Sequence, residues 1–423
     1  MSTIHSFKAI RPNPPHAAEV SCPPYDVVST EEARELADGR PSSYLHVIRP
    51  EIDLPDGADP HADAVYDRGL SEMERLISEG MLLEDAEPGM FAYRLVHGGR
   101  RQLGLVCTVD AAEYRDGRIR KHEKTRPDKE DDRTRHLLTS SMHAEGVFLA
   151  YREEADPGEE IRGMLLAATA DRPLVHFKAD GTTHTLWRIS EAAEFEAAFT
   201  RIPELYIADG HHRSAAGERA ATARAADDPT HSGSEEYNRI LAAIFPAGDL
   251  EILPYNRIVS DLNGLDSDGI VKALATIGEL APLPEDADPG VLAKGEVAIR
   301  LPDQWYRLTF PADSIPHEDP IASLDVALLQ DRILAPILGI GDPRTDSRIG
   351  FVGGIRGTTE LEQRVDEGTA AIAFSLHATS MDELLRVADA GEIMPPKSTW
   401  FEPKLRSGLF AHRFETTEEC ATR

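Results

Sequence analysis

The stretch that decides the fold around it is Leu205-Tyr206-Ile207-Ala208-Asp209-Gly210-His211-His212-Arg213, which opens an alanine-rich segment over 214–221. A short apolar run, a glycine and an alanine-rich segment predict a strand, a tight turn and a helix start. The first backbone N–H groups of a helix have no partner within it and lie at the positive end of its dipole, so they attract anions. The pattern therefore predicts a phosphate site at this turn.

The residue types of the turn support this prediction. Gly210 lets a phosphate approach the backbone closely, and Arg213 can hold it with two N–H donors. His211 and His212 add hydrogen-bonding groups. A purely structural role stays open, because Asp209 could cap the helix while the histidines and the arginine pair on the surface. Two histidines beside an aspartate and an arginine in one turn favour the functional interpretation.

A second cluster covers residues 120–133 and reads RKHEKTRPDKEDDR. The chain has nine lysines, and three of them lie within these fourteen residues. Lys121 and Lys124 are candidates to neutralise phosphates or hold the substrate, and Glu123 is a candidate general base or Mg²⁺ ligand. The alternative is a solvated charged loop.

Two proline-rich stretches, 22–28 and 395–404, contribute Asp26 and Lys397 as candidate substrate-binding residues, although such stretches also serve as rigid connectors.

Composition restricts the function. The 423 residues are enough for roughly two or three core-bearing units. The formal net charge of −29 disfavours non-specific binding to nucleic acid or anionic membrane, because both require a basic surface. Cys22, Cys107 and Cys420 are too few and too scattered for a disulfide framework or a cysteine zinc site. With no apolar run approaching the ~18 residues of a membrane span, we expect a cytoplasmic protein.

Hydrophobic periods alternate between helix and strand along the chain. Turn residues separate three pairs of apolar runs, which predict β-hairpins over 91–110, 173–189 and 296–310. Helical spacing predicts a helix over about 65–77, and capping-box pairs predict helix starts at Thr359 with Glu362 and at Ser380 with Glu383. The expected fold class is α+β: mixed, with hairpin-rich sheets. We expect an N-terminal segment at 1–100, a phosphate-binding core at 101–260 and a C-terminal segment at 261–423.

Five motifs together resemble the DUF1015 family of bacterial and archaeal proteins. They are Pro-Pro-Tyr-Asp-Val at 23–27, His-Glu-Lys-Thr at 122–125, Leu-Tyr-Ile-Ala-Asp-Gly-His-His-Arg at 205–213, Leu-Asp-Val-Ala-Leu-Leu-Gln at 324–330 and Met-Pro-Pro-Lys-Ser-Thr at 394–399. The similarity runs nearly end to end. Within it, the Asp-Gly-His-His-Arg turn is similar to the signature turn of the ParB/sulfiredoxin-like fold, and especially to the free-serine kinases of that fold.

The resemblance implies a ParB/sulfiredoxin-like core with additional α/β segments. It implies that Gly210, His211, His212 and Arg213 bind nucleotide phosphates and that Asp209 lies near a metal ion or the substrate hydroxyl. The catalytic glutamate of the kinases has no alignable counterpart, so Glu123 is a candidate on chemical grounds alone. The chain also lacks the Walker phosphate-binding loop, because the glycine-rich stretch at 350–354 has no lysine.

Three functions follow as hypotheses. The first is a phosphotransferase that uses ATP or ADP with Mg²⁺ and acts on a small hydroxylated metabolite such as free serine, with Glu123 or Asp209 activating the hydroxyl. The second is a metal-dependent hydrolase or phosphatase with His122, His211, His212 and Glu123 as ligands. The third is a non-catalytic nucleotide-binding regulator. We expect a nucleotide and a small molecule as partners, and neither nucleic acid nor membrane; the oligomeric state stays open.

Overall fold

The computed structural model describes residues 1–55, 57, 59–154 and 156–415, and Cys420 lies outside this part of the chain. The chain divides into two compact units: Met1–Leu250 together with the segment that begins at Pro403, and Glu251–Glu402. This division differs from the three predicted segments. A boundary near residue 100 would cut a hairpin, because β4 (Phe91–His97) and β5 (Arg100–Asp110) pair across it in a continuous antiparallel register.

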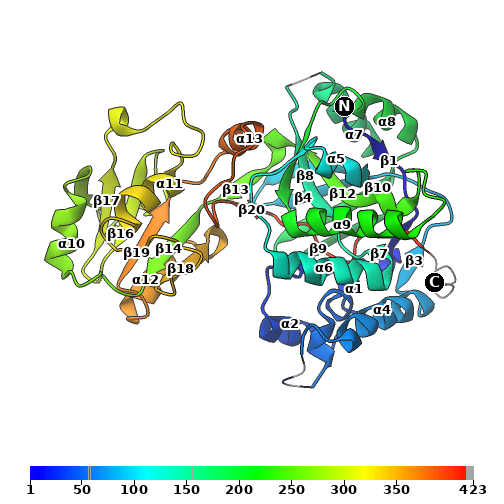
Figure 1. Cartoon of the computed structure of the whole chain (residues 1–423), viewed down its shortest axis with the longest axis horizontal. Helices are drawn as coiled ribbons and strands as arrows, with labels where there is room; N and C mark the ends of the chain where they lie inside the picture. The colour runs from blue at the N-terminus through cyan, green and yellow to red at the C-terminus, as the bar shows by residue number, and fades with distance from the viewer. Residues whose placement is uncertain (56, 58, 155, 416–423) are drawn as a thin grey trace. The chain divides into compact units, whose positions relative to one another are not determined.

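The first unit is built on a large mixed sheet (Figure 1). Its strands follow the order β6-β11-β8-β12-β5-β4-β10-β9, with β1 pairing on β5. The strands not yet defined are β1 (Ile4–His5), β6 (Ile119–Arg120), β8 (Val147–Tyr151), β9 (Val175–Ala179), β10 (Thr182–Arg188), β11 (Leu205–Asp209) and β12 (Arg239–Pro246). Most pairs are antiparallel, whereas β6 with β11 and β8 with β12 are parallel. The predicted hairpins over 91–110 and 173–189 are confirmed by β4–β5 and β9–β10.

Helices cover this sheet and an N-terminal layer. They are α1 (Ala17–Val20), α2 (Thr30–Ala37), α3 (Leu45–Ile48), α4 (Asp63–Ser78), α5 (Ala111–Arg115), α6 (Pro127–Ser140), α7 (Gly158–Ala168), α8 (Ala192–Phe199) and α9 (His211–Asp227). A small sheet of order β3-β2-β21-β7 joins distant parts of the chain through Leu82–Glu84, Ala9–Pro12, Ala411–Arg413 and Met142–His143. The helix predicted over 65–77 is confirmed by α4.

Helix α9 packs closely against both the sheet and α6, and the two helices run side by side in Figure 1. The alanines of α9 are buried at 215, 216, 220 and 221, where their small side chains allow close approach. Gly217 faces a still narrower gap, because a Cβ atom there would lie 2.9 Å from Cγ1 of Ile240. Tight packing therefore fixes the start of α9 relative to the sheet.

The second unit has its own antiparallel sheet of order β15-β17-β16-β19-β14-β18. These strands are Glu279–Pro282, Trp305–Thr309, Glu296–Arg300, Ile372–Leu376, Tyr255–Val259 and Ile349–Gly353; β13 (Glu251–Leu253) pairs with β20 (Trp400–Glu402). Its helices are α10 (Ser267–Leu274), α11 (Asp325–Leu329), α12 (Thr359–Asp366) and α13 (Met381–Asp389). The predicted hairpin over 296–310 is confirmed by β16–β17.

The two capping-box predictions have different outcomes. Ser380 caps α13 and Glu383 closes the reciprocal hydrogen bond, as predicted. The helix predicted at Thr359 is confirmed by α12, but its capping box is not formed: the N-cap is Thr358 without a side-chain cap, and Glu362 accepts from the indole of Trp305. The α+β class with hairpin-rich sheets is confirmed. The strand, turn and helix on which the resemblance to the ParB/sulfiredoxin-like fold rests are β11, Gly210 and α9.

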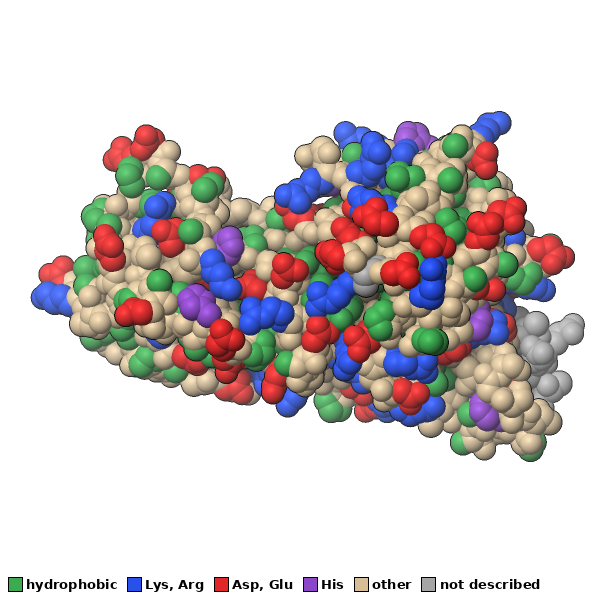
Figure 2. Space-filling view, turned by 90° about the horizontal axis from the view of Figure 1, so that it is seen from above, with side chains coloured by type: hydrophobic (Ala, Val, Ile, Leu, Met, Phe, Trp, Pro, Cys, Tyr) green, Lys and Arg blue, Asp and Glu red, His purple; other side chains and the backbone are tan. Residues whose placement is uncertain are grey.

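Acidic and basic side chains are interspersed on the face of the molecule in Figure 2. The net charge is −29, but many of the acidic side chains form ion pairs with basic ones. Two examples are Arg11 with Asp85 and Arg219 with Asp131. Among the described helices, none is both long and apolar enough to cross a bilayer.

We expect that Gly104→Val in the centre of β5 destabilises the first unit. A Cβ atom at Gly104 would lie 2.6 Å from the carbonyl oxygen of Ile244 and 2.6 Å from Cδ1 of Phe245, so strand β12 would have to move. Overpacking of this kind costs about 1–3 kcal/mol.

Gly163→Ala is the control, because the exposed Gly163 has open space at its Cβ position and alanine favours helix by roughly 0.5–1 kcal/mol. Thermal unfolding should give a lower midpoint for the first variant and an unchanged or higher one for the second; equal midpoints would contradict the packing described.

Candidate functional site

Strand pairing brings three segments of the chain to the turn at Gly210. Strands β11 and β8 are antiparallel, and Asp209 at the end of β11 pairs with Phe148 near the start of β8. Glu145 and Gly146, which precede β8, therefore lie beside the turn. The segment after Pro403 also reaches this edge of the first unit, where Lys404 contacts Asp209.

Gly210 connects the strand to the helix in a left-handed conformation with φ 92°. A side chain at this position would be strained, and its Cβ atom would lie 2.9 Å from Nε of Arg213. No side chain caps α9, so Asp209 does not act as the N-cap that the structural alternative required. The 17-residue helix therefore begins without a capping side chain for the backbone N–H groups of its first turn.

Asp209 is held by two cations. Its Oδ1 accepts from Nζ of Lys404 at 2.8 Å, and its Oδ2 accepts from Nη2 of Arg213 at 2.8 Å. Nη1 of Arg213 also donates to the carbonyl oxygen of Gly146 at 2.6 Å. Burial alone would raise the pKa of Asp209, but Lys404 and Arg213 outweigh it and keep this pKa well below its usual range. Asp209 is therefore ionised at neutral pH, and its cations are fixed in place.

His211, His122 and Glu123 form a second group beside the turn. The rings of His122 and His211 meet edge to face with centroids 4.4 Å apart, and Oε2 of Glu123 lies 4.0 Å from Nδ1 of His211. Burial lowers the pKa of His122 to about 4 and lowers that of His211 as well, so both imidazoles are neutral at pH 7. The side chain of Glu123 is half exposed.

His212 joins the turn to the charged segment that precedes α6. Its Nε2 accepts a hydrogen bond from the backbone N–H of Arg126 at 3.1 Å, and the N–H of His122 approaches Nε2 of His211 at 3.5 Å. The structure thus brings together two segments that lie more than eighty residues apart in sequence. Part of the predicted charged loop is helical, because α6 begins at Pro127.

Asp26 lies within electrostatic range of the same cations. Its exposed carboxylate makes no hydrogen bond or ion pair within the described residues, yet it raises the pKa of Arg213 and of Lys404 against the effect of burial. The neighbouring Tyr25 is buried under the guanidinium of Arg133, which lies 4.4 Å from its ring centroid. The proline-rich stretch at 22–28 therefore contributes to the site.

The three candidate lysines have different surroundings. The ammonium group of Lys121 lies 3.6 Å from the ring centroid of Tyr114, and burial lowers its pKa. Lys124 is exposed between His122 and Arg126, next to the turn. Lys397 belongs to the second unit, where its ammonium group lies 5.6 Å from the ring centroid of Tyr255 and its carbonyl oxygen accepts from Arg257. Because the turn lies in the first unit, the role of Lys397 at the site stays a prediction.

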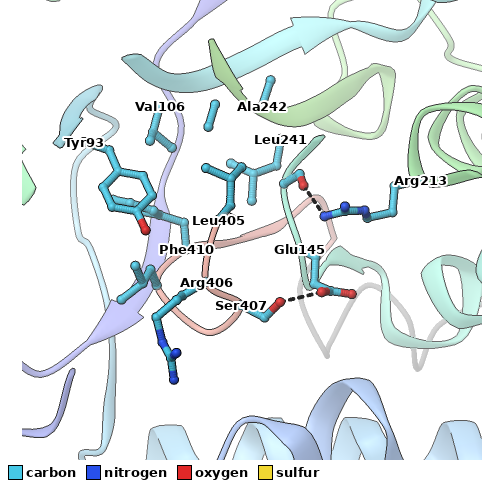
Figure 3. A pocket seen from close by; sticks show the side chains of 13 residues that line it. Tyr93, Val106, Glu145, Arg213, Leu241, Ala242, Leu405, Arg406, Ser407 and Phe410 are labelled. Atoms are coloured by element: carbon cyan, nitrogen blue, oxygen red, sulfur yellow. Dashed lines mark hydrogen bonds between the residues drawn. The ribbon is translucent and has the colours of Figure 1, made fainter. Parts of the chain in front are cut away.

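Sequence reasoning missed Glu145 and Ser407 as site residues. Both line a small, partly open pocket next to Arg213, together with apolar side chains from the sheet and the C-terminal segment (Figure 3). Oε1 of Glu145 accepts from the hydroxyl of Ser407 and, at 3.4 Å, from the N–H of Tyr25. Burial raises the pKa of Glu145, although Arg213 and Ser407 oppose the shift. No local motif marks Glu145, because its importance comes from strand pairing.

The arrangement does not fit Asp209 as a metal ligand. Both of its oxygens already accept hydrogen bonds from cations, which would repel a divalent ion. The histidines diverge: Nε2 of His211 is directed to the N–H of His122, whereas Nε2 of His212 is directed to that of Arg126. Within the described residues, no three histidine, cysteine or acidic side chains are grouped as a metal site would require.

The family model described as "Protein of unknown function (DUF1015)" matches residues 4–327. The chain belongs to this family. The match includes the turn at Gly210 and the motifs at 23–27, 122–125 and 205–213, whereas the motif at 394–399 lies beyond it. The chain matches no curated protein.

Three of the solved structures that match this chain have low sequence identity to it and low TM-scores. A conserved hypothetical protein from Pyrococcus furiosus is 14% identical with a TM-score of 0.33, and covers 70% of this chain and 90% of its own. A free serine kinase in complex with AMP is 13% identical with a TM-score of 0.37, over 74% of this chain and 93% of its own. SbnI from Staphylococcus aureus, with a C-terminal truncation, is 9% identical with a TM-score of 0.38, over 75% and 93%.

We expect the stability contributed by Asp209 to depend on pH. Its pKa is lower in the folded protein than in the unfolded chain, so the folded state binds fewer protons at this group. This stability is fully present above the unfolded pKa of about 3.9 and is lost as the pH falls through the folded value. Asp209→Asn should lower the unfolding midpoint at pH 7, and the difference from wild type should shrink below about pH 4.

The control is Asp67→Asn, which changes an exposed carboxylate on α4. Its midpoint should follow that of wild type across the same pH range. An Asp209→Asn midpoint equal to that of wild type at pH 7 would contradict a stabilising role of the contacts with Lys404 and Arg213.

Proposed function

We propose that this protein is a nucleotide-dependent phosphotransferase that acts on a small hydroxylated metabolite, of which free serine is one example. The observation that carries the proposal is the start of α9, where uncapped backbone N–H groups follow a left-handed glycine and lie next to fixed cations. Phosphoryl transfer requires positioning and charge neutralisation more than covalent chemistry by the protein. This site contains groups suited to both.

The phosphates of ATP or ADP would bind at the N–H groups of His211, His212 and Arg213. Because burial keeps the pKa of both histidines low, the histidines act there as neutral hydrogen-bonding groups. Positive potential comes from Arg213 and Lys404, which are held on Asp209, and from the exposed Lys124. Arg213 acts through its fixed position, since two of its nitrogens already donate to Asp209 and Gly146.

Glu123 is the better placed of the two proposed bases. Asp209 has both oxygens engaged by cations and a strongly lowered pKa, so it is a weak base. Glu123 instead presents a half-exposed carboxylate beside His211, at the start of the helix where the phosphates would bind. Mg²⁺ would enter with the nucleotide, because it is commonly held by substrate phosphates and water. Asp26 is proposed to contact the acceptor.

We expect that Arg213→Lys weakens the binding of ADP or ATP about tenfold, although the charge is kept. A lysine cannot bridge Asp209 and the carbonyl of Gly146 as the guanidinium fork does, so the start of α9 would lose its alignment. Arg219→Lys on the same helix is the matched control, because Arg219 pairs with Glu130 and Asp131 on the surface. Calorimetric titration of each protein with both nucleotides and Mg²⁺ measures the effect. Equal affinities for Arg213→Lys and wild type would assign Arg213 a purely structural role.

We expect that Glu123→Gln separates binding from turnover. The amide keeps the shape of the side chain but cannot accept a proton, so phosphate transfer should fall by roughly a hundredfold or more while nucleotide affinity changes little. Glu218→Gln on α9 is the control and should leave both quantities within about twofold of wild type. Labelled nucleotide, Mg²⁺ and a pool of hydroxylated metabolites give the readout as phosphorylated product. If wild-type protein binds nucleotide but neither transfers nor hydrolyses phosphate, it is a nucleotide-binding regulator instead.

A further inference from the structure

The pocket beside Arg213 is chemically distinct from the phosphate turn. Its walls are mainly apolar and come from the sheet and the C-terminal segment, with Val106, Leu241, Leu405 and Phe410 among them (Figure 3). Arg213 lines the pocket and also donates to Asp209, so the pocket and the turn share one guanidinium group. A small molecule in this pocket would therefore lie next to bound phosphates.

Glu145 is the acidic group of this pocket, and its carboxylate is only partly satisfied. Ser407 and the N–H of Tyr25 both donate to Oε1. Within the described residues, Oε2 receives no hydrogen bond, and no lysine or arginine nitrogen lies within 4.0 Å of the carboxylate. Oε2 also retains access to solvent, because it is not among the buried polar atoms without a partner. One carboxylate oxygen is thus available to a ligand.

The charged side chains around Glu145 carry one more negative charge than positive charge. The guanidinium of Arg406 donates to Ser21 and pairs with Asp180, and Arg133 pairs with Asp132. Excluding these pairs, the cations that act on the site are Arg213 and Lys404, against the carboxylates of Asp26, Asp209 and Glu145. The balance is one negative charge. Burial raises the pKa of Glu145, and Arg213 and Ser407 oppose the shift.

An organic ammonium group fits this pocket better than a metal ion does. A divalent cation requires several oxygen ligands, whereas one carboxylate, one hydroxyl and apolar walls suit an ammonium group attached to a short carbon chain. The ammonium group can donate to Oε2 of Glu145 in a charge-assisted hydrogen bond, and the carbon atoms can contact the apolar walls.

We propose that the pocket is the acceptor subsite and that Glu145 binds the ammonium group of a small amino alcohol or hydroxy amino acid. The inference rests on the proposed phosphotransfer function, because it places the hydroxyl of the same molecule toward the phosphate turn. Glu145 is a specificity-determining residue in this scheme. It selects acceptors that carry an amine. A molecule that carries only hydroxyl groups would bind more weakly, because the carboxylate of Glu145 would then be buried without a positive partner.

The test is a ligand-observed NMR titration of the full-length protein in the presence of ADP and Mg²⁺. The probes are L-serine and ethanolamine, with L-glycerate and ethylene glycol as counterparts in which a hydroxyl replaces the amine. At least one amine should bind wild-type protein about tenfold or more tightly than its counterpart. That affinity should fall about tenfold or more in Glu145→Gln, in which the amide retains the contact with Ser407.

Glu153→Gln is the matched control, because Glu153 is another partly buried glutamate with a raised pKa, but it accepts from Gly248 outside the pocket. Its affinity for the amine should stay within twofold of wild type. The inference is overturned if no amine binds, if the hydroxyl-only probes bind as tightly, or if Glu145→Gln binds like wild type. The comparison of probes on wild-type protein decides the question even if the variant does not fold.

The outcomes also distinguish this inference from the proposed function. Amine binding that depends on Glu145, without phosphate transfer to any amine, supports the subsite and contradicts the phosphotransferase. Phosphate transfer to molecules that lack an amine supports the phosphotransferase and contradicts the role of Glu145.

Discussion

The ion cluster at Asp209 is the interaction on which the rest of the site depends. A carboxylate at the end of β11 would be costly to bury alone, and here one oxygen accepts from Lys404 and the other from Arg213. Each cation belongs to a different segment, so the same charge joins the end of β11, the first turn of α9 and the C-terminal segment. Loss of Asp209 would leave two largely buried cations without the carboxylate that they share.

This cluster also explains the chemistry of the turn. The two Nη groups of Arg213 donate to the carbonyl oxygen of Gly146 and to Asp209, which holds the guanidinium in place beside the turn. Its contribution is positive potential at a fixed point beside uncapped N–H groups. The neutral histidines and the half-exposed Glu123 lie beside the same turn, and in the proposed function Glu123 acts there as the base.

The second unit has a separate sheet and a separate core, and Lys397 belongs to it. Its motif at 394–399 is anchored within that unit, where buried Arg257 donates to the carbonyl oxygens of Pro396 and Lys397. The sequence placed Lys397 among the candidate site residues because lysines are scarce in this chain. The small number of lysines makes each one a candidate, but it does not predict which residues surround it.

The sequence by itself determined the local elements: the strand, tight turn and helix start at 205–213, three hairpins and the α4 helix. These depend on hydrophobic period, turn residues and helix propensity, which act over a few positions. Only the tertiary structure decided that Lys404 meets Asp209 across 195 residues and that Glu145 opens into a pocket beside Arg213. The register of β8 on β11 and the return of the C-terminal segment set these contacts, and no local pattern in the sequence encodes which distant segments pair.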